Sequence, residues 1–381
     1  MSKRNTRTGG RVVVDQLHIH GVERAFCVPG ESYLALLDAF YDVPGIALTV
    51  CRHESGAAMM ADAYGKLTGR PGICIVTRGP GATNASAGVH IAYQDSTPLI
   101  LLIGQVSRNS LDREAFQEID FRRMYGQLAK WVAQIDDARR IPEYLSRAFY
   151  TATSGRQGPV VLALPEDMLS DAVEVSDAEP YQRVEAYPGT NAMQALRTLL
   201  SECQRPLMIL GGSGWTADAC DAIKTFSEAN NVPVGASFRC QHLFDNTHPN
   251  YIGDIGIGIN PKLAQRIRDA DLLLVIGARL GEMTTSGYTL VDIPTPKQNL
   301  IHVYAGVEEL GRVYQPRLAI NASMPAFAAA ARALEPVDSI AWESWTGDGH
   351  ADYLANIVPQ HGPGDLQLAE IAFWLRQHLP A

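Results

Sequence analysis

Residues 49–77 read TVCRHESGAAMMADAYGKLTGRPGICIVT, and their pattern decides the fold. The apolar run IALTVC predicts a strand over residues 46–51, and GICIVT predicts a second strand over residues 72–77. Between them, the spacing of small and apolar residues predicts a helix that Gly69 closes. Fully apolar strands such as ICIV are typical of a parallel sheet that helices cover on both faces. The stretch therefore predicts one strand–helix–strand unit of an α/β fold.

Within this stretch, Glu54 stands where the first strand gives way to the helix. A carboxylate at the first turn of a helix is stabilised by the free N–H groups there, which gives Glu54 a purely structural interpretation. The alternative is a ligand site, because open α/β sheets bind ligands at the carboxyl ends of their strands. The ligand site is favoured by the small residues that follow, which would let another body approach closely: Gly56, Ala57, Ala58 and Ala61.

The alternation of strands and helices continues on both sides of this unit. It predicts a first α/β domain over residues 11–170 and, after an acidic linker with two prolines over 171–190, a second one over 191–335. The fold class is therefore α/β, with two doubly wound, mostly parallel-sheet domains. Residues 336–381 are expected to hold a loose stretch, EPVDSIAWESWTGDGHADYLANIVPQHGPG, and then a last helix, DLQLAEIAFWLRQHLP.

The composition is that of a globular protein, with 46% hydrophobic and 19% charged residues and a formal net charge of −9. Because no long basic run is present, we expect no nucleic-acid partner. No stretch approaches the roughly 18 apolar residues of a membrane span, so we expect no membrane association. Six cysteines without a CxxC pair predict no metal site and reduced thiols, as in a cytoplasmic protein.

The stretch RGPGATN, residues 78–84, lies between a predicted strand and a predicted helix, where phosphate groups are often bound. It lacks the Gly-Lys-Ser/Thr of a P-loop and the GxGxxG spacing of a dinucleotide site. As a phosphate motif it is weak, and it does not by itself predict a nucleotide site.

Four motifs in this order carry a resemblance to a known family: RHESGAAMMADAYGKLTGRPG, VTRGPGATN, YQDSTPLILLIGQV and EAFQEID. Together they resemble the pyrimidine-binding domain of thiamin-diphosphate enzymes of the acetolactate synthase group. The resemblance covers about residues 11–335, and the second domain resembles the Rossmann-like central domain of that group. It implies thiamin diphosphate as cofactor, a 2-oxo acid or aldehyde as substrate, and carboligation or decarboxylation as the reaction.

The resemblance also implies a catalytic role for Glu54, whose position matches the family's glutamate that hydrogen-bonds N1′ of the aminopyrimidine. A carboxyl group there shares a proton with the ring and favours the tautomer that removes the C2 proton of the thiazolium to give the ylid. By the same resemblance, four further residues line the pyrimidine pocket: Pro29, Thr77, Gly81 and Asn84. Phe116 and Gln117 match the substrate channel, against the alternative that Phe116 is a core aromatic.

Two positions depart from the family pattern. Glu166 stands in ALPED where the resemblance implies a channel lysine, so it reverses a charge on the path of an anionic 2-oxo acid. In GARLGEMTTSGYT, residues 277–289, Arg279 is retained but the rest of a run that contacts FAD and substrate is not. Two alternatives stay open for the central domain: it binds FAD through Arg279 and GGSGW, residues 211–215, or it holds no cofactor. Both departures count against acetolactate synthesis from pyruvate, the reaction that leads to branched-chain amino acids.

The family holds the diphosphate and Mg²⁺ in a third domain that carries a Gly-Asp-Gly motif and an Asn about 25 to 30 residues later, which suits the preference of Mg²⁺ for oxygen ligands. Gly347-Asp348-Gly349 does not fit this motif, because it follows the polar WESWT and Asn356 is too close. The final LRQHLP resembles the helix that opens this third domain. We therefore expect residues 336–381 to be a linker and the first helix of that domain, the rest of it to be absent from the chain, and Mg²⁺ to be bound through the missing domain or a partner chain. The expected partner is a second copy, in a homodimer or tetramer, or a second chain. A non-catalytic nucleotide-binding (FAD-binding) or regulatory subunit is the alternative.

Overall fold

The computed structural model describes residues 6–360 and 362–379. Residues 1–5, 361 and 380–381, which include the start of the polar N-terminal stretch and the end of the last predicted helix, lie outside the described residues. The chain divides into two compact units, with the boundary between Glu185 and Ala186. This boundary falls inside the predicted linker. The predicted domain ranges divide the chain more finely than these two units, and they stay predictions.

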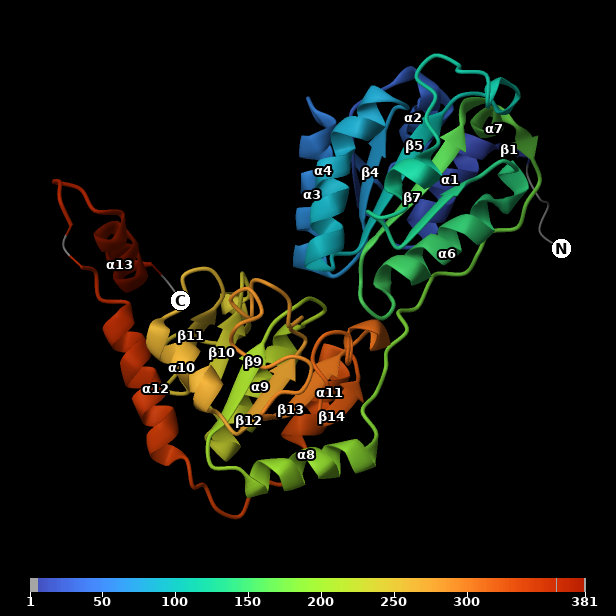
Figure 1. Cartoon of the computed structure of the whole chain (residues 1–381). Helices are drawn as coiled ribbons and strands as arrows, with labels where there is room; N and C mark the ends of the chain where they lie inside the picture. Colours follow the sequence, from blue (N-terminus) through green and yellow to red (C-terminus); the bar gives the residue numbers. More distant parts are fainter. Residues whose placement is uncertain (1–5, 361, 380–381) are drawn as a thin grey trace. The chain divides into compact units, whose positions relative to one another are not determined.

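The first unit is built on a six-stranded parallel sheet with the strand order β3-β2-β4-β5-β7-β6 (Figure 1). Its strands are β2 (Arg24–Cys27), β3 (Ala47–Val50), β4 (Gly72–Val76), β5 (Leu99–Gln105), β6 (Trp131–Gln134) and β7 (Pro159–Pro165). A short antiparallel pair, β1 (Arg7–Thr8) and β8 (Ala172–Val173), joins the two ends of the unit.

Helices cover both faces of this sheet. One apolar core lies under α1 (Gly9–Ile19), α2 (Leu34–Asp42), α6 (Ile141–Thr153) and the short α7 (Glu166–Ser170). The other lies under α3 (Glu54–Thr68), α4 (Pro80–Asp95) and the short α5 (Phe121–Tyr125). Strands β4, β5 and β7 are buried along their whole length, as their uninterrupted apolar sequences predicted.

The stretch that decides the fold has the structure its pattern predicted. Helix α3 begins at Glu54 and ends at Thr68, and Gly69 follows in the left-handed conformation, with φ 67°, that favours glycine. His53 caps the first turn, because its Nδ1 accepts the backbone N–H of Ser55 at 3.2 Å. Glu54 therefore enters the helix directly after the carboxyl end of β3.

The small residues of α3 serve mainly to pack the helix. Ala57, Ala58 and Ala61 are fully buried. A Cβ on Gly88 of α4 would lie 2.5 Å from Cβ of Ala58, so the two helices meet at these small side chains. Only Gly56 has open space around its Cα. At the three alanines the body that approaches closely is α4 or the sheet, and Gly56 alone among the four small residues leaves space for a further group.

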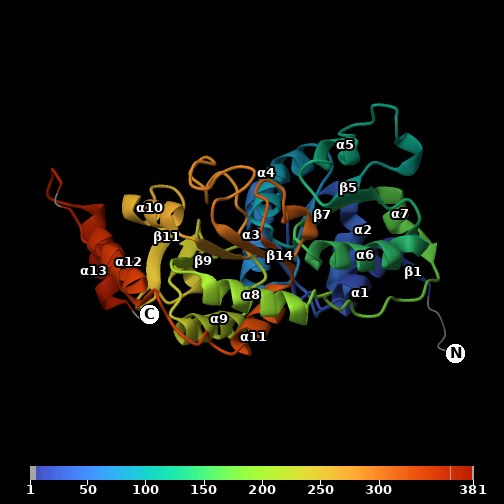
Figure 2. The ribbon, with the colours of Figure 1, turned by 60° about the horizontal axis from the view of Figure 1, so that its bottom comes forward.

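The second unit is built on another six-stranded parallel sheet, with the strand order β11-β10-β9-β12-β13-β14 (Figure 1). Figure 2 labels β11, β9 and β14 of this sheet from a second direction. This is the doubly wound order 3-2-1-4-5-6 that is typical of dinucleotide-binding folds. The strands are β9 (Pro206–Leu210), β10 (Val234–Ser237), β11 (Tyr251–Ile255), β12 (Leu272–Ile276), β13 (Asn299–Tyr304) and β14 (Leu318–Asn321). The two sheets confirm the predicted fold class.

Six helices accompany this second sheet in the described part of the chain, with apolar cores on its two faces. They are α8 (Thr190–Glu202), α9 (Ala217–Asn230), α10 (Pro261–Asp269), α11 (Met324–Arg332), α12 (Glu343–Asn356) and α13 (Leu368–His378). Helix α13 matches the last predicted helix, and none of its described residues is buried.

Helix α12 was not predicted, because residues 335–364 were expected to lack regular structure. It packs on β11, and Trp342, which precedes it, is 1% exposed. The indole Nε1 of Trp342 donates to the carbonyl oxygens of Asn230 and Asn231, at 3.1 Å and 3.0 Å. Asp352 of α12 pairs with Arg266 of α10 at 2.9 Å. Helix α12 is therefore part of the second unit, and Gly347-Asp348-Gly349 lies within it.

Residues 174–185, in the predicted linker, run along the first unit and contact it at His20. Nδ1 of His20 accepts the backbone N–H of Tyr181 at 3.2 Å, and its ring packs 4.6 Å from the ring of Phe149, centroid to centroid. The Nε2 atom is buried without a partner. Because Nδ1 accepts a hydrogen bond, the imidazole is neutral with its proton on Nε2. Burial lowers the pKa of His20 below its usual 6.5.

This arrangement predicts a pH-dependent stability for the first unit. Because the pKa of His20 is lower in the folded state, the unfolded chain takes up the proton first as the pH falls. The contribution of neutral His20 to the free energy of unfolding is therefore fully present above pH 6.5. It is lost as the pH falls from 6.5 towards the lowered pKa, by at most about 1.4 kcal/mol per pH unit. Urea unfolding between pH 7.5 and 5 should show this slope. His20→Gln should remove it, and His90→Gln, at an exposed position, should leave it.

The six cysteines are all free, so the chain holds no disulfide between them. Among the described residues, no helix has the length and apolar character needed to span a bilayer.

Candidate active site

The carboxylate of Glu54 lies at the carboxyl edge of the first sheet, half-buried at the start of α3. Asn84 of α4 orients it, because its Nδ2 donates to Oε2 of Glu54 at 3.0 Å. The next residue, Ser55, donates its hydroxyl to the backbone carbonyl of Asn84 at 2.9 Å. Two hydrogen bonds thus join the first turns of α3 and α4. Oε1 of Glu54 has no hydrogen-bond partner among the described residues, so it is the oxygen left to bind a ligand.

The turn between β4 and α4 closes against this carboxylate. A Cβ on Gly81 would lie 2.7 Å from Cγ2 of Thr77 and 3.4 Å from Oε1 of Glu54, so any larger residue would press on both. The hydroxyls of Thr77 and Ser32 lie 2.8 Å apart, in hydrogen-bond contact. A Cβ on Gly30 would lie 2.5 Å from Cβ of Thr77, which explains the glycine after Pro29.

The structure therefore brings together most of the predicted pocket residues. Glu54, Thr77, Gly81 and Asn84 form one contact group, while Pro29 reaches it only through its neighbour Gly30. The carboxylate of Glu54, the amide of Asn84 and the hydroxyl of Thr77 thus lie around one turn. The cofactor-binding roles of the five residues stay predictions.

Phe116 and Gln117 lie on the loop between η2 (Arg108–Ser110) and α5. Phe116 is 78% exposed, which rules out the alternative that it is a core aromatic within this chain. Gln117 lies against Gly79, where a Cβ would come within 2.8 Å of Cβ of Gln117. Because Gly79 is two residues from Gly81, this contact connects the loop to the turn beside Glu54. Their role in a substrate channel stays a prediction.

Glu166 does not present an uncompensated negative charge. Its Oε2 pairs with Nη1 of Arg78 at 2.8 Å, and its Oε1 accepts the hydroxyl of Ser107 at 2.8 Å. The expected charge reversal on the substrate path therefore needs correction: Arg78, which directly follows Thr77, neutralises it. Arg78 and Ser32 were not among the predicted site residues. A signal for Arg78 was present in RGPGATN, since an arginine at the end of a buried strand requires a partner.

A hollow of about 290 Å³ lies beside this ion pair. Its lining is mixed, with polar and apolar side chains in similar measure, and comes from the segments that follow β2, β5 and β7. The polar members include Glu31, Ser32, Ser107, Glu166 and Asp167, and the apolar members are Leu34, Ala35 and Leu169.

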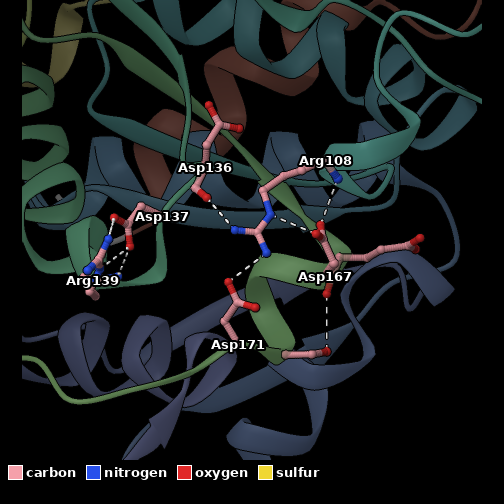
Figure 3. A network of polar contacts seen from close by, with 8 residues as sticks. Arg108, Asp136, Asp137, Arg139, Asp167 and Asp171 are labelled. Atoms are coloured by element: carbon pink, nitrogen blue, oxygen red, sulfur yellow. Dashed lines mark hydrogen bonds and ion pairs between the residues drawn. The ribbon is translucent and has the colours of Figure 1, made fainter.

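A second arginine, Arg108, fixes the segments around this edge (Figure 3). Its Nε donates to Asp167 and its Nη2 to Asp171, both at 2.8 Å, and its Nη1 donates to the carbonyl of Asp136, also at 2.8 Å. Hydrogen bonding to Asp167 raises the pKa of Arg108. Burial opposes ionisation of Asp167, but the hydrogen bonds from Arg108 prevail and lower the pKa of that carboxyl. The start of the loop that carries Phe116 is thus tied to α7.

In the second unit, Arg279 follows β12 and pairs through Nε with Oε2 of Glu309, at 3.2 Å. Glu309 is buried and lies 3.6 Å from a second cation, Arg312. The two glycine turns that follow β9 and β12 meet back to back: a Cβ on Gly212 would lie 2.0 Å from the carbonyl oxygen of Gly277. Both turns lie where the strand order reverses, which is the position at which such sheets bind ligands.

No group of three or more His, Cys, Asp or Glu side chains is placed to hold a metal ion within residues 6–360 and 362–379. The Gly347-Asp348-Gly349 sequence lies in the interior of α12, and Gly349 packs on Ile252. A helix interior does not provide the loop that a diphosphate–metal motif requires.

Comparison with known families finds one model that matches each unit. The model described as thiamine pyrophosphate enzyme, N-terminal TPP binding domain, matches residues 7–124. The model described as thiamine pyrophosphate enzyme, central domain, matches residues 193–331. The chain therefore belongs to the thiamine pyrophosphate enzyme family, as the resemblance predicted.

Several relatives are large subunits of acetolactate synthase. The chain is 29% identical to acetolactate synthase isozyme 2 large subunit of Escherichia coli, over 97% of this chain and 70% of the relative. It is 33% identical to the acetolactate synthase large subunit of Haemophilus influenzae, over 78% of this chain and 52% of the relative. With the Corynebacterium glutamicum large subunit it shares 29% identity, over 94% of this chain and 58% of the relative. The chain thus spans between 52% and 70% of the length of these proteins.

Proposed function

We propose that this protein supplies the pyrimidine-binding half of a thiamin-diphosphate enzyme of the acetolactate synthase group, which carboligates or decarboxylates 2-oxo acids. The observation that carries the proposal is the orientation of Glu54. The side-chain amide of Asn84 donates to one carboxylate oxygen. The other oxygen faces the Gly81 turn and has no hydrogen-bond partner in the part of the chain that the structure describes.

The residues present fit the aminopyrimidine of this cofactor. When bound, thiamin diphosphate supplies a carbon nucleophile that attacks the carbonyl group of the substrate. Oε1 of Glu54 would hold the ring by a hydrogen bond and keep or release one proton there. Asn84 keeps Glu54 in place while its proton moves. Thr77 and Gly81 shape the wall of the pocket, and a larger residue than Gly81 would close it.

The proposal assigns Mg²⁺ and the diphosphate to a further domain or to a partner chain, which we expect to be a second copy or a chain that carries the diphosphate-binding domain. A 2-oxo acid or an aldehyde would enter beside Phe116 and Gln117. A cytoplasmic location and a homo-oligomeric state belong to the same proposal.

A second candidate function rests on the second unit. Its strand order and the two glycine turns at the point of reversal favour a nucleotide such as FAD, bound in a non-catalytic or regulatory subunit. Arg279, the residue predicted to contact FAD, is already paired with Glu309, so it would have to serve both partners. Yellow colour and flavin fluorescence in the purified protein would support this candidate.

Calorimetry with thiamin and with thiamin diphosphate tests the proposed function on the 381-residue chain. Because the proposal places only the pyrimidine in this chain, we expect both compounds to bind with affinities within about threefold of each other, a difference below ~1 kcal/mol. We also expect no effect of Mg²⁺. Absence of saturable binding by either compound would contradict the role of the first unit. Tight, Mg²⁺-dependent binding of thiamin diphosphate alone would contradict the assignment of the metal to another domain.

A further inference from the structure

The loop over residues 111–120, which carries Phe116 and Gln117, is held in a conformation that its sequence alone does not favour. Three of its residues that are not glycine have left-handed backbones: Asp112 with φ 61°, Glu114 with φ 53° and Gln117 with φ 66°. Residues other than glycine adopt this conformation only where the surroundings impose it, and such positions cluster at functional sites. The conformation therefore needs a specific restraint.

Glu118 supplies that restraint. Its Oε1 accepts the backbone N–H of Asp112 at 2.7 Å, and its Oε2 accepts the backbone N–H of Ala115 at 3.0 Å. Its own backbone N–H donates to the carbonyl of Ala115 at 2.9 Å, which closes the loop a third time. Hydrogen bonds from backbone N–H groups to a carboxylate are stronger than neutral ones. One half-buried side chain thus ties both ends of the turn that presents Phe116.

The restrained loop is connected to the candidate active site on its other side. Gln117 follows Phe116 directly and packs against Gly79. A Cβ added to Gly79 would lie 2.8 Å from Cβ of Gln117 and 2.9 Å from its carbonyl oxygen. Gly79 has a left-handed backbone, with φ 53°, and begins the turn that reaches Gly81. A shift of the loop would therefore move Gln117 off the turn that faces Glu54.

We propose that Glu118 is a positioning residue: it holds the loop so that Phe116 and Gln117 are presented to the substrate in one fixed place. This inference rests on the proposed function, in which these two residues line the substrate path. Because both carboxylate oxygens of Glu118 accept backbone N–H groups of the loop, the residue acts through the loop. Its effect is to keep the loop from sampling other conformations, which would misplace both side chains.

Glu118→Gln is the variant that tests this role, because the amide keeps the size of the side chain but turns an N–H donor towards one of the two backbone N–H groups. Hydrogen–deuterium exchange, followed by mass spectrometry of peptides over residues 110–118, should show the amides of Asp112 and Ala115 exchanging at least ~10-fold faster. Glu114→Gln is the matched control. Glu114 lies in the same loop, is exposed and forms no hydrogen bond or ion pair within the described residues, so its variant should exchange like the wild type.

The functional readout separates positioning from folding. In the protein assembled with the partner that completes it, Glu118→Gln should lower kcat/KM for a 2-oxo acid by about 10- to 100-fold and leave the affinity for thiamin diphosphate unchanged. Unchanged amide exchange, or an unchanged kcat/KM, would overturn the inference and leave the proposed function standing. Loss of thiamin binding in the wild type would overturn both. Should Glu118→Gln not fold, Glu118→Asp, whose shorter carboxylate reaches only one of the two N–H groups, should show an intermediate rise in exchange.

Discussion

Replacing Glu54 by glutamine is expected to slow strongly the protein-promoted exchange of the C2 proton of thiamin diphosphate with solvent. Glutamine has almost the same size and can still accept the hydrogen bond from Asn84, but it cannot share a proton at Oε1. Since general acid–base catalysis contributes about 10²- to 10⁴-fold, the exchange rate should fall by that factor. Proton NMR of the C2 signal in D₂O measures this rate without any second substrate.

Glu143→Gln is the matched control for this experiment. Glu143 is also a carboxylate in the first turn of a helix of the first unit, but it lies at the surface and pairs with Arg140. Its variant should leave the exchange rate unchanged, and both variants should keep the unfolding temperature of the wild type within a few degrees. Equal exchange rates in the wild type and in Glu54→Gln would show that Glu54 acts only as a helix-start carboxylate, which was the structural alternative.

The fold of the first unit was predictable because local signals and tertiary structure agree there. Gly69 ends α3 in the structure, as the sequence pattern predicted. Ile73 and Ile75 are buried in β4, as the apolar run predicted. The candidate site was predictable only through the resemblance. Glu54 by its spacing alone fits a helix-start carboxylate as well as a ligand site, and the contact with Asn84 depends on how two helices meet.

Contacts between distant segments explain what the sequence analysis missed. Arg78 and Glu166 are 88 positions apart, so no local pattern shows that one charge neutralises the other. The backbone conformation of the loop likewise determines which two N–H groups donate to Glu118, and the EAFQEID motif does not reveal this conformation. In both cases the residue type was visible, but its partner was determined by strand order and loop conformation.

The failure at α12 has a different cause. Its sequence includes two glycines, Gly347 and Gly349, and a run of polar residues, which lower the helix propensity. The signal that favours a helix is the spacing of the residues buried in the second unit: Trp342, Thr346, Gly349 and Tyr353, at intervals of four, three and four. Gly349 is required there, because a Cβ would lie 2.8 Å from Cγ2 of Ile252. Packing on the unit therefore outweighs local propensity.

That packing predicts the largest stability effect in the chain. Trp342→Ala should destabilise the second unit by about 3–5 kcal/mol, since a fully buried aromatic side chain is removed and a cavity is left. The carbonyl oxygens of Asn230 and Asn231 would also lose their shared donor, at the end of α9. The free energy of unfolding, from denaturant titration followed by circular dichroism, measures the loss.

Trp374→Ala provides the matched control, because Trp374 lies on α13 and is 55% exposed. Its removal should change the free energy of unfolding by no more than about 0.5 kcal/mol. The comparison decides whether α12 belongs to the second unit energetically as well as geometrically. A loss below about 1 kcal/mol in Trp342→Ala would mean that residues 336–360 contribute little to this unit and behave as the linker that the sequence predicted. A loss within the expected range would make the α12 region an integral part of the second unit, so that a boundary drawn at residue 335 would cut through a folded core.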